Sequence, residues 1–534
     1  MSITNLVNLG PTSTSIINSV KDLGKAISDL SQTLFVFKNS EDDSIVVSTE
    51  AEQSTNSNKS LETIVSPVEY QNLGSKAFMK AHNLKYPYVA GAMANGIASS
   101  DLTIAMGKAG MLCFFGAGGL HPRRVHEELL KIKKELGSTS FGFNLLHNPH
   151  EPSIEEKTVE MYIEHGITKV SAAAYLGLNS YIVHYRLNGL KRDANGKVVA
   201  KNSIFAKLSR SETARKFMAP APKKIVDQLL KEGKITAQEA ELSQFIPMAQ
   251  DITAEADSGG HTDNRPLVSL LPTFVNLKNQ AMEEYKFDEE IRVGAAGGIS
   301  TPQSVLAAFA MGASYVVTGS VNQAAIESGT SDYVRELLSK MEPHDVAMAA
   351  AADMFEMGVK LQVLKKGCMF PMRANKLYQI YQSCDSIETI PQKDKLQIEK
   401  QIFHKTLEEI WEDTAKFFQD RDPSQLVKAA KNPKHKMALV FRWYLGKSSL
   451  WAISGDESRK MDYQIWAGPA MGAFNEWTKD SSLADPKNRK AVVIAHNLLK
   501  GAAVLSRMNQ LKVAGVNISE QDLSFGPDAN MKVN

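Results

Sequence analysis

The sequence predicts a (β/α)₈ barrel with an inserted segment and a C-terminal helical subdomain. From Tyr86 onward, short apolar runs that end in Gly, Ala or Asn alternate with helix-length amphipathic stretches, a rhythm typical of repeated βα units. Eight such runs occur, and eight parallel strands close a barrel. After about Asp345 the strand pattern disappears and helical periodicity replaces it. An open doubly wound sheet would produce a similar alternation and is the alternative.

The expected strands are the runs YPYVAGAM, GMLCFFGAG, SFGFNLL, ITKVSAAA, YIVHYRL, DITAEAD, IRVGAAGG and SYVVTGS, between Tyr86 and Ser320. Helix starts are indicated between them. Ser153 and Glu156 are spaced as a capping box, and Thr301-Pro302 places proline where the first helical turn tolerates it. These signals favour alternating strands and helices over a purely helical or purely β fold.

The chain divides into three predicted parts. Residues 1–65 are rich in Ser, Thr and Asn and are expected to form a mobile polar arm, in which LFVFKN and SIVVST could pair as a small hairpin. Residues 66–345 are expected to form the barrel, interrupted at about 188–243 by a polar and basic insertion that we interpret as a lid. Residues 346–534 are expected to be helical, with KLQIEKQIFHKTLEEIWEDTAKFF and NRKAVVIAHNLLKGAAVLSRMNQL as examples.

The overall composition excludes several classes of protein. The 534 residues carry a formal net charge of +2, so no global field draws the chain to nucleic acid or to an anionic membrane. Three cysteines without a C-x-x-C pair suggest neither a disulfide framework nor a zinc site. The first residues lack the pattern of a signal peptide, and no apolar run is long enough to span a bilayer. We therefore expect a cytoplasmic protein without a metal site.

Two glycine-rich turns near the end of the barrel indicate an anion site. Residues 295–300, AAGGIS, follow the seventh strand, and residues 318–320, TGS, follow the eighth. In barrels of this class these two loops commonly bind a phosphate, because exposed backbone amides point at it. Ordinary tight turns would explain either one alone. The chain has no G-x-x-x-x-G-K-[ST] or H-E-x-x-H motif, so the phosphate is expected to belong to a cofactor such as FMN.

A histidine after a glycine pair is the candidate catalytic group. Gly259 and Gly260 in AEADSGGHT would let the chain pack against a flat ring, and His261 would then lie at the barrel mouth. An imidazole there can donate a hydrogen bond or a proton near neutral pH. A turn histidine is the simpler interpretation, but the carboxyl end of a barrel strand is where barrel active sites lie.

Small residues after the first strand and an amide after the third complete the predicted site. The turn Gly91, Ala92, Met93 and Ala94 could cover one face of a flavin, and Asn144 offers a donor and an acceptor to its ring or ribityl chain. Small residues also close barrels for packing reasons alone. Four of the five tryptophans lie within residues 441–477, either as bulk in a helical core or as an apolar wall for an acyl chain.

Taken together, these motifs resemble the nitronate monooxygenase and flavin-dependent enoyl reductase group over about Tyr86 to Ser328. Within that group the chain is similar to the PfaD-type trans-acting enoyl reductases of polyunsaturated fatty acid and polyketide synthases. The residues that carry this narrower resemblance are AEADSGGHTDNRP, HYRLNGL, KGCMFPMRANKLYQIY and DYQIWAGPAMGAFNEW, which extend it to about Trp477. One departure is that Asp257 and Ser258 lie between Glu255-Ala256 and the glycine pair, which leaves the partner of His261 open.

The resemblance implies an FMN barrel that uses NADPH (or NADH) to reduce an enoyl thioester on an acyl carrier protein, alongside other synthase subunits. It implies that His261 is the active-site histidine. The residues implied to contact FMN are Gly91, Ala92, Met93, Ala94, Asn144, Gly259, Gly260, Gly297, Gly298, Thr318, Gly319 and Ser320. A nitronate-oxidising flavoprotein and a non-catalytic scaffold of a synthase complex are the alternatives. The sequence leaves a homodimer open.

A carrier protein is generally acidic, so its docking surface is expected to be basic. The candidates are KNPKHK at 431–436 with Arg442, the pair Arg123 and Arg124, and the pair Lys223 and Lys224. For any one of these clusters a solvated helix face is the simpler interpretation.

Overall fold

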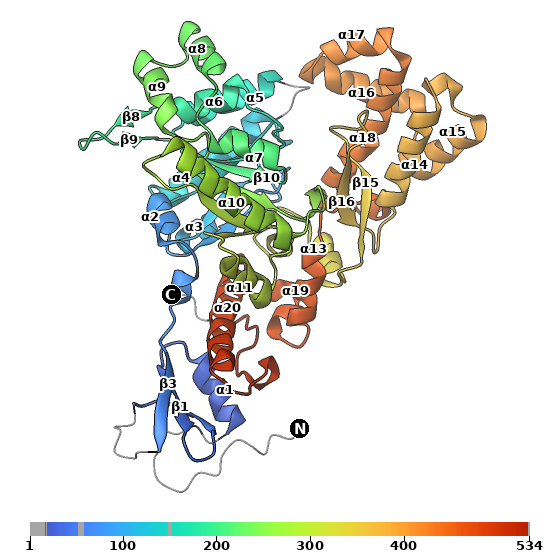
Figure 1. Ribbon diagram of the computed structural model, residues 1–534. Coiled ribbons are helices and arrows are strands. Elements are labelled where there is room, and N and C mark those ends of the chain that lie inside the picture. Colours follow the sequence, from blue (N-terminus) through green and yellow to red (C-terminus); the bar gives the residue numbers. More distant parts are fainter. Residues whose placement is uncertain (1–16, 18, 52–57, 148–151, 532–534) are drawn as a thin grey trace.

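The computed structural model describes residues 17, 19–51, 58–147 and 152–531. Its centre is a closed barrel of parallel strands in the order β10-β11-β13-β14-β4-β5-β6-β7, which confirms the predicted fold class (Figure 1). The barrel strands are β4 (Tyr88–Ala90), β5 (Leu112–Phe115), β6 (Gly142–Leu146), β7 (Lys169–Ala173), β10 (Ser203–Leu208), β11 (Asp251–Glu255), β13 (Arg292–Ala296) and β14 (Val316–Thr318). The helices around them are α2 (Lys76–His82), α3 (Ser100–Lys108), α4 (Pro122–Leu136), α5 (Pro152–Glu164), α6 (Ser180–Leu187), α7 (Ser211–Met218), α8 (Lys223–Lys231), α9 (Ala237–Leu242), α10 (Leu267–Tyr285), α11 (Pro302–Ala310), α12 (Ser320–Gln323) and α13 (Asp332–Ser339).

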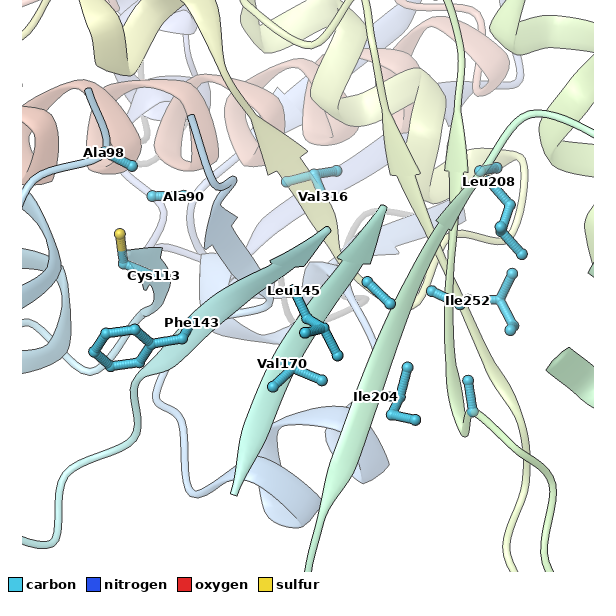
Figure 2. Packing of buried hydrophobic residues seen from close by; sticks show 14 of the residues in the cluster. Ala90, Ala98, Cys113, Phe143, Leu145, Val170, Ile204, Leu208, Ile252 and Val316 are labelled. Carbon is cyan, nitrogen blue, oxygen red and sulfur yellow. The ribbon is translucent and has the colours of Figure 1, made fainter. Parts of the chain in front are cut away.

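Alternate residues of each strand separate two apolar layers. Val89, Phe114 and Phe205 point into the barrel, where Phe78 of α2 packs against them. Their chain neighbours pack outward against the helices, and Figure 2 shows Val170 and Ile204 of adjacent strands in this outer layer. Because successive side chains of a strand point to opposite faces and both faces are covered, most residues of these strands are apolar.

The amino end of the barrel is closed by a buried ion pair. Arg292 donates to both carboxylate oxygens of Asp251, at 2.7 and 2.9 Å, and His82 Nε2 lies 2.9 Å from Asp251 Oδ2. Burial alone would raise the pKa of Asp251, but its ionic contacts with His82 and Arg292 hold that pKa well below its usual range. The network ties α2 to β11 and β13 at the end of the barrel away from the strand carboxyl termini.

The fifth barrel strand differs from the prediction. Residues 181–187, YIVHYRL, form helix α6, and the fifth strand is β10, which pairs with β7 and β11. The run SIFAKL lies inside the predicted insertion, where the surrounding polar residues concealed it. In YIVHYRL, Ile182, Val183 and Tyr185 are all buried, so apolar residues lie on more than one side of the helix. Periodicity cannot distinguish such a helix from a strand.

Residues 188–243, for which we predict a lid, include barrel strand β10 and helix α7, and residues 207–210 and 213 of this segment lie at the carboxyl ends of the strands. A hairpin of β8 (Lys191–Arg192) and β9 (Val198–Val199) follows α6, and α8 and α9 follow α7. Helices in a βα unit return the chain to the amino end of the next strand, so segments that follow α6 and α7 lie at that end. Lys197 accordingly pairs with Glu289, just before β13, at 2.8 Å.

The helix starts are confirmed in one case and not in the other. Thr301 caps α11, accepting from the backbone N–H of Ser304, and Pro302 occupies the first turn. Ser153 lies inside α5, which begins at Pro152, so it is no cap. The expectation failed because Pro152 itself is well suited to the first helical turn.

The N-terminal part contains the predicted hairpin, β1 (Leu34–Asn39) with β2 (Ile45–Ser48), and also β3 (Lys59–Val65) and α1 (Val20–Ser28). These elements pack on the end of α20 (Ala491–Val513), with Val36, Val504 and Leu511 in one cluster (Figure 1). The mobility expected for residues 1–16 and 52–57 concerns positions outside the described residues.

The region after residue 345 is mostly helical but begins with an unpredicted antiparallel pair, β15 (Val346–Ala350) and β16 (Lys360–Leu364). The helices that follow are α14 (Phe370–Ser383), α15 (Gln392–Ile398), α16 (Leu407–Arg421), α17 (Ser424–Lys431), α18 (Pro433–Ser454), α19 (Ala470–Thr478) and α20. The alanine-rich residues 346–351 predict a helix. They form a strand instead, because β16 pairs with them along their length. None of the described helices is long and apolar enough to cross a bilayer.

Candidate active site

A large cavity of about 1870 Å³ lies at the carboxyl ends of the barrel strands. The barrel loops line one side, and β16, α16 and α18 line the other. All of the sequence-predicted residues line this cavity: Gly91, Ala92, Met93, Ala94, Asn144, Gly259, Gly260, His261, Gly297, Gly298, Thr318, Gly319 and Ser320. The structure therefore brings the predicted site together, while the role of each residue remains a prediction.

The two glycine turns after β13 and β14 form an open cradle. A Cβ atom built on Gly298 or Gly319 would meet no heavy atom within 4 Å. Within the described residues, the backbone N–H groups of Gly298, Gly319 and Ser320 have no hydrogen-bond acceptor. Gly297 serves a different purpose: its φ is +83°, and a Cβ would lie 2.6 Å from the backbone of Ala256. Gly297 shapes the turn, and the others leave donors exposed.

The hydroxyl groups of this region are already engaged. Thr318 is buried, and its hydroxyl donates to Tyr88 at 2.8 Å while accepting from the Asn322 amide. Ser320 Oγ accepts from the backbone N–H of Gly468 at 3.2 Å. The groups of Thr318 to Ser320 that remain for a ligand among the described residues are therefore the backbone amides of Gly319 and Ser320 and the O–H of Ser320, which only accepts in its contact with Gly468.

His261 is held by a short strand rather than by a free loop. Gly260 and His261 form β12, which pairs antiparallel with β16 opposite Gln362 and Leu361. A Cβ on Gly259 would lie 2.7 Å from Ala467, so the glycine permits close contact with the segment before α19. The glycine pair therefore lies at the contact between the barrel and the C-terminal region, and it also lines the cavity.

The partner of His261 is Asp353, in the loop between β15 and β16. His261 Nε2 lies 3.1 Å from Asp353 Oδ1, and the two side chains are 45% and 58% exposed to the cavity. Burial of the imidazole favours its neutral form, but the hydrogen bond and charge of Asp353 outweigh this effect and raise the pKa of His261. The same contact lowers the pKa of the Asp353 carboxyl against its own desolvation. The pair therefore favours a protonated imidazole at the cavity wall.

Asn144 braces the loops around the cavity. Its Nδ2 donates to Ser171 O at 3.2 Å, and its Oδ1 accepts from Gly118 N at 3.3 Å. The neighbouring turn at Met93 is equally constrained, because a Cβ on Gly116 would meet Met93 O. The ends of β4, β5 and β6 are fixed together by these contacts.

Three polar groups of the cavity were missed by sequence reasoning. Lys207 pairs with Glu255 at 2.8 Å across the carboxyl ends of β10 and β11; Lys207 was missed because its strand was not assigned. Asp353 was missed because its segment was read as helix. His147 follows β6 directly and pairs with Glu155 at 2.9 Å, and its position after a strand was the signal that could have found it.

The predicted basic docking residues are largely engaged within the chain. Lys434 Nζ lies 5.1 Å from the ring centre of Tyr381, and Lys436 Nζ is equally far from that of Trp411. Arg442 lies apart from them in the cavity, 3.6 Å from Glu356. In the remaining pairs, Arg124 binds Glu128 at 2.5 Å and Lys223 binds Asp227 at 2.8 Å.

A closed parallel barrel whose carboxyl-end loops gather glycine turns and paired histidines defines an enzyme-type site of the (β/α)₈ class. The relatives refine this class. The chain belongs to the nitronate monooxygenase family, whose model matches residues 75–377. Residues 384–463 match a second model, the inserted helical domain of [acyl-carrier-protein] S-malonyltransferase.

Two of the similar proteins are named for the biosynthesis of polyketides or polyunsaturated fatty acids. The chain is 46% identical over 436 residues to the polyketide biosynthesis protein PksE of Bacillus subtilis, covering 82% of this chain and 56% of that protein. It is 45% identical over 472 residues to a polyunsaturated fatty acid synthase protein of Thraustochytrium, covering 87% of this chain and 32% of that protein. The chain thus spans about half the length of these relatives or less.

A solved structure of a reductase domain is similar over most of this chain. The crystal structure of the enoyl reductase domain of MlnA, from the macrolactin biosynthesis cluster of Bacillus amyloliquefaciens, has a TM-score of 0.79 and 40% identity. The match covers 83% of this chain and 99% of that domain. Together, the family and this structure support an oxidoreductase.

Proposed function

We propose that the chain is an FMN-dependent enoyl reductase that acts in trans on enoyl thioesters carried by an acyl carrier protein, with NADPH or NADH as reductant. The observation that carries this proposal is the open cradle of Gly298, Gly319 and Ser320 beside His261 in one cavity. Its support from relatives is the 40% identity to an enoyl reductase domain over nearly that whole domain.

The cavity fits FMN in size and in the chemistry of its donors. The unpaired amides of Gly298, Gly319 and Ser320 would hold the phosphate, since exposed backbone N–H groups bind anions. Gly91 to Ala94 and Asn144, on the neighbouring loops, would contact the ring and the ribityl chain. When bound, FMN would supply hydride transfer from the reduced nicotinamide to the enoyl group.

His261 would act on the thioester. Negative charge develops on the thioester carbonyl when the β-carbon gains a hydride, and the α-carbon must then gain a proton. A cationic imidazole can serve either need, by donating a hydrogen bond to the oxygen or a proton to the carbon. Asp353 favours the protonated form that both roles require.

The C-terminal helices provide an apolar wall for an acyl chain. Phe417 of α16 is 53% exposed and Leu450 of α18 is 46% exposed, and both line the cavity together with Trp443 and Trp466. Trp477, in contrast, packs against the main apolar core, as expected of bulk. Apolar side chains exposed inside a cavity are a feature of sites that bury an apolar ligand.

An anaerobic titration tests the proposal. NADPH is added to the purified protein with FMN, the flavin absorbance is followed, and an enoyl thioester on an acyl carrier protein is then added. Bleaching that the thioester reverses supports the reductase. Bleached flavin that recovers only with oxygen supports nitronate-type oxidation, and protein that binds no flavin supports a scaffold.

The family resemblance to nitronate monooxygenases is weaker evidence for function than that to the reductase domain. A probable nitronate monooxygenase of Staphylococcus haemolyticus is 25% identical over 279 residues, which cover 48% of this chain. The helices α16 and α18, which provide the apolar wall, lie outside the residues matched by the nitronate monooxygenase model. A small nitronate needs no such wall, so reduction of a larger substrate is favoured.

A further inference from the structure

A second histidine lies on the wall of the cavity across from His261. His147 directly follows β6, whereas His261 follows β11, and β7 and β10 separate these two strands in the barrel. Both histidines line the same cavity. The two imidazoles therefore face one ligand space from different sides.

His147 is held by a buried carboxylate. Its Nδ1 lies 2.9 Å from Glu155 Oε2, and the Glu155 side chain is only 1% exposed. The second oxygen of Glu155 accepts from the Tyr175 hydroxyl at 2.7 Å and from Asn179 Nδ2 at 2.7 Å. The imidazole also stacks on Tyr175, with ring centres 5.1 Å apart.

These contacts fix which nitrogen of His147 carries a proton. Burial would raise the pKa of Glu155, but its hydrogen bonds with His147, Asn179 and Tyr175 outweigh burial and lower it. An ionised Glu155 only accepts, so His147 Nδ1 must donate. Asn179 Nδ2 also lies 3.2 Å from His147 Nδ1, but a nitrogen that already donates cannot accept, and the contact with Glu155 is the hydrogen bond.

The other ring nitrogen remains available to a ligand. Among the described residues, Nε2 of His147 has no hydrogen-bond partner, and the side chain is 26% exposed at the cavity. Glu155, Tyr175 and Asn179 would by themselves link α5, the segment after β7 and α6 by hydrogen bonds, so His147 is not needed for that structural purpose. The added imidazole, oriented by a carboxylate and open at Nε2, has the arrangement of an acid–base group.

We propose that Nε2–H of protonated His147 donates the proton that the enoyl thioester takes up at its α-carbon, with Glu155 as a positioning residue. This assignment rests on the proposed function. The C=C π bond breaks, a hydride forms the new C–H bond at the β-carbon, and the Nε2–H bond breaks as the α-carbon gains its proton. The product is the saturated thioester, and neutral His147 keeps Nδ1–H toward Glu155 and regains a proton from water.

The proposal divides the work between the two histidines. Glu155 is buried and receives three donors, so the orientation of His147 is fixed before a substrate binds. The His261–Asp353 pair is about half exposed, and water competes for it. The fixed imidazole suits proton transfer to one carbon atom, and His261 is left to donate a hydrogen bond to the thioester oxygen.

Separate measurement of the two half-reactions tests the assignment. Stopped-flow absorbance follows the FMN-loaded protein, first during reduction by NADPH and then during reoxidation by the enoyl thioester. His147→Gln should leave reduction unchanged, because hydride transfer from the nicotinamide needs no proton from this residue, and should slow reoxidation by about 10²- to 10⁴-fold. Glu155→Gln should cause a smaller loss in the same step. His344→Gln, at an exposed site outside the cavity, is the matched control.

A nitroalkene distinguishes proton donation from a purely structural role. Addition of a hydride to a nitroalkene gives a stable nitronate that can leave the protein, so no residue needs to protonate its carbon atom. With a nitroalkene that the wild type is shown to reduce, His147→Gln should keep near wild-type reoxidation, whereas His261→Gln should slow both substrates because it removes the hydrogen bond to the developing negative charge.

Several results would overturn the assignment. One is a His147→Gln variant whose flavin the thioester reoxidises at the wild-type rate. Another is a reoxidation rate that falls equally with the thioester and with the nitroalkene. Parallel loss of both half-reactions, with lower FMN content or earlier thermal unfolding in both His147→Gln and Glu155→Gln, would show a structural role instead. These outcomes remove only the role of His147. Wild-type protein that NADPH cannot bleach overturns the proposed function itself.

Discussion

Replacement of Gly319 by alanine separates ligand binding at the glycine cradle from folding. The backbone φ of Gly319 is −125°, and its new Cβ would meet no protein atom within 4 Å. The methyl group would therefore enter the space above the unpaired amides without a clash inside the protein. We expect the unfolding free energy of the apoprotein to change by no more than about 0.5 kcal/mol.

FMN binding should weaken instead. A hydrogen bond to a charged group contributes about 1.5–3 kcal/mol, and the loss of one such bond to the phosphate raises Kd by about tenfold to 150-fold at about 1.4 kcal/mol per tenfold. Quenching of flavin fluorescence on titration measures Kd, and thermal unfolding of the apoprotein measures stability.

Two further glycines serve as comparisons. Gly526→Ala, at another open position outside the cavity, should leave both quantities unchanged. Gly297→Ala should destabilise even the apoprotein by about 1–2 kcal/mol or more, because its φ is +83° and its Cβ would meet the Ala256 backbone. Wild-type FMN affinity in Gly319→Ala would refute a phosphate site at this cradle.

Three other predictions address the site and the barrel. His261→Ala should keep the yellow cofactor but lose most enoyl reduction, at least about 10²-fold, as turnover assays would show; undiminished turnover removes His261 from the mechanism. Reversal of Lys434 and Lys436 to Glu should raise the apparent KM for carrier-bound substrate and spare a small thioester analogue, and equal effects on both would argue against docking there. Asp251→Asn should destabilise the fold by about 3–5 kcal/mol in denaturant unfolding, because it leaves Arg292 buried without its counter-charge. Because the pKa of Asp251 is lowered in the folded state, its carboxylate contributes its full stabilisation above about pH 4, and this stabilisation is lost as the pH falls below that. The unfolding free energies of the wild type and the variant should therefore converge in acid. A difference that stays constant with pH would contradict this.

The parts of the site that sequence could predict are those encoded by local chemistry. Glycine pairs at strand ends, as at Gly297 and Gly298, mark turns whatever surrounds them. His261 could be placed at the mouth because barrel geometry puts every strand's carboxyl end there. The element boundaries failed where the local pattern is ambiguous. Helix α6 is buried on most sides, so its sequence resembles a strand, and β10 is flanked by polar residues that resemble a loop.

The sequence by itself determined the barrel, the glycine turns of the cavity and the histidine that follows a glycine pair, because periodicity and turn chemistry are local properties. Only the tertiary structure decided which carboxylates accompany His147 and His261. Asp353 is 92 residues from His261 along the chain and reaches it through the pairing of β12 with β16. Glu155 is oriented by Tyr175 and Asn179 from the next βα unit. Such contacts depend on how distant elements pack, and no spacing within the chain encodes them.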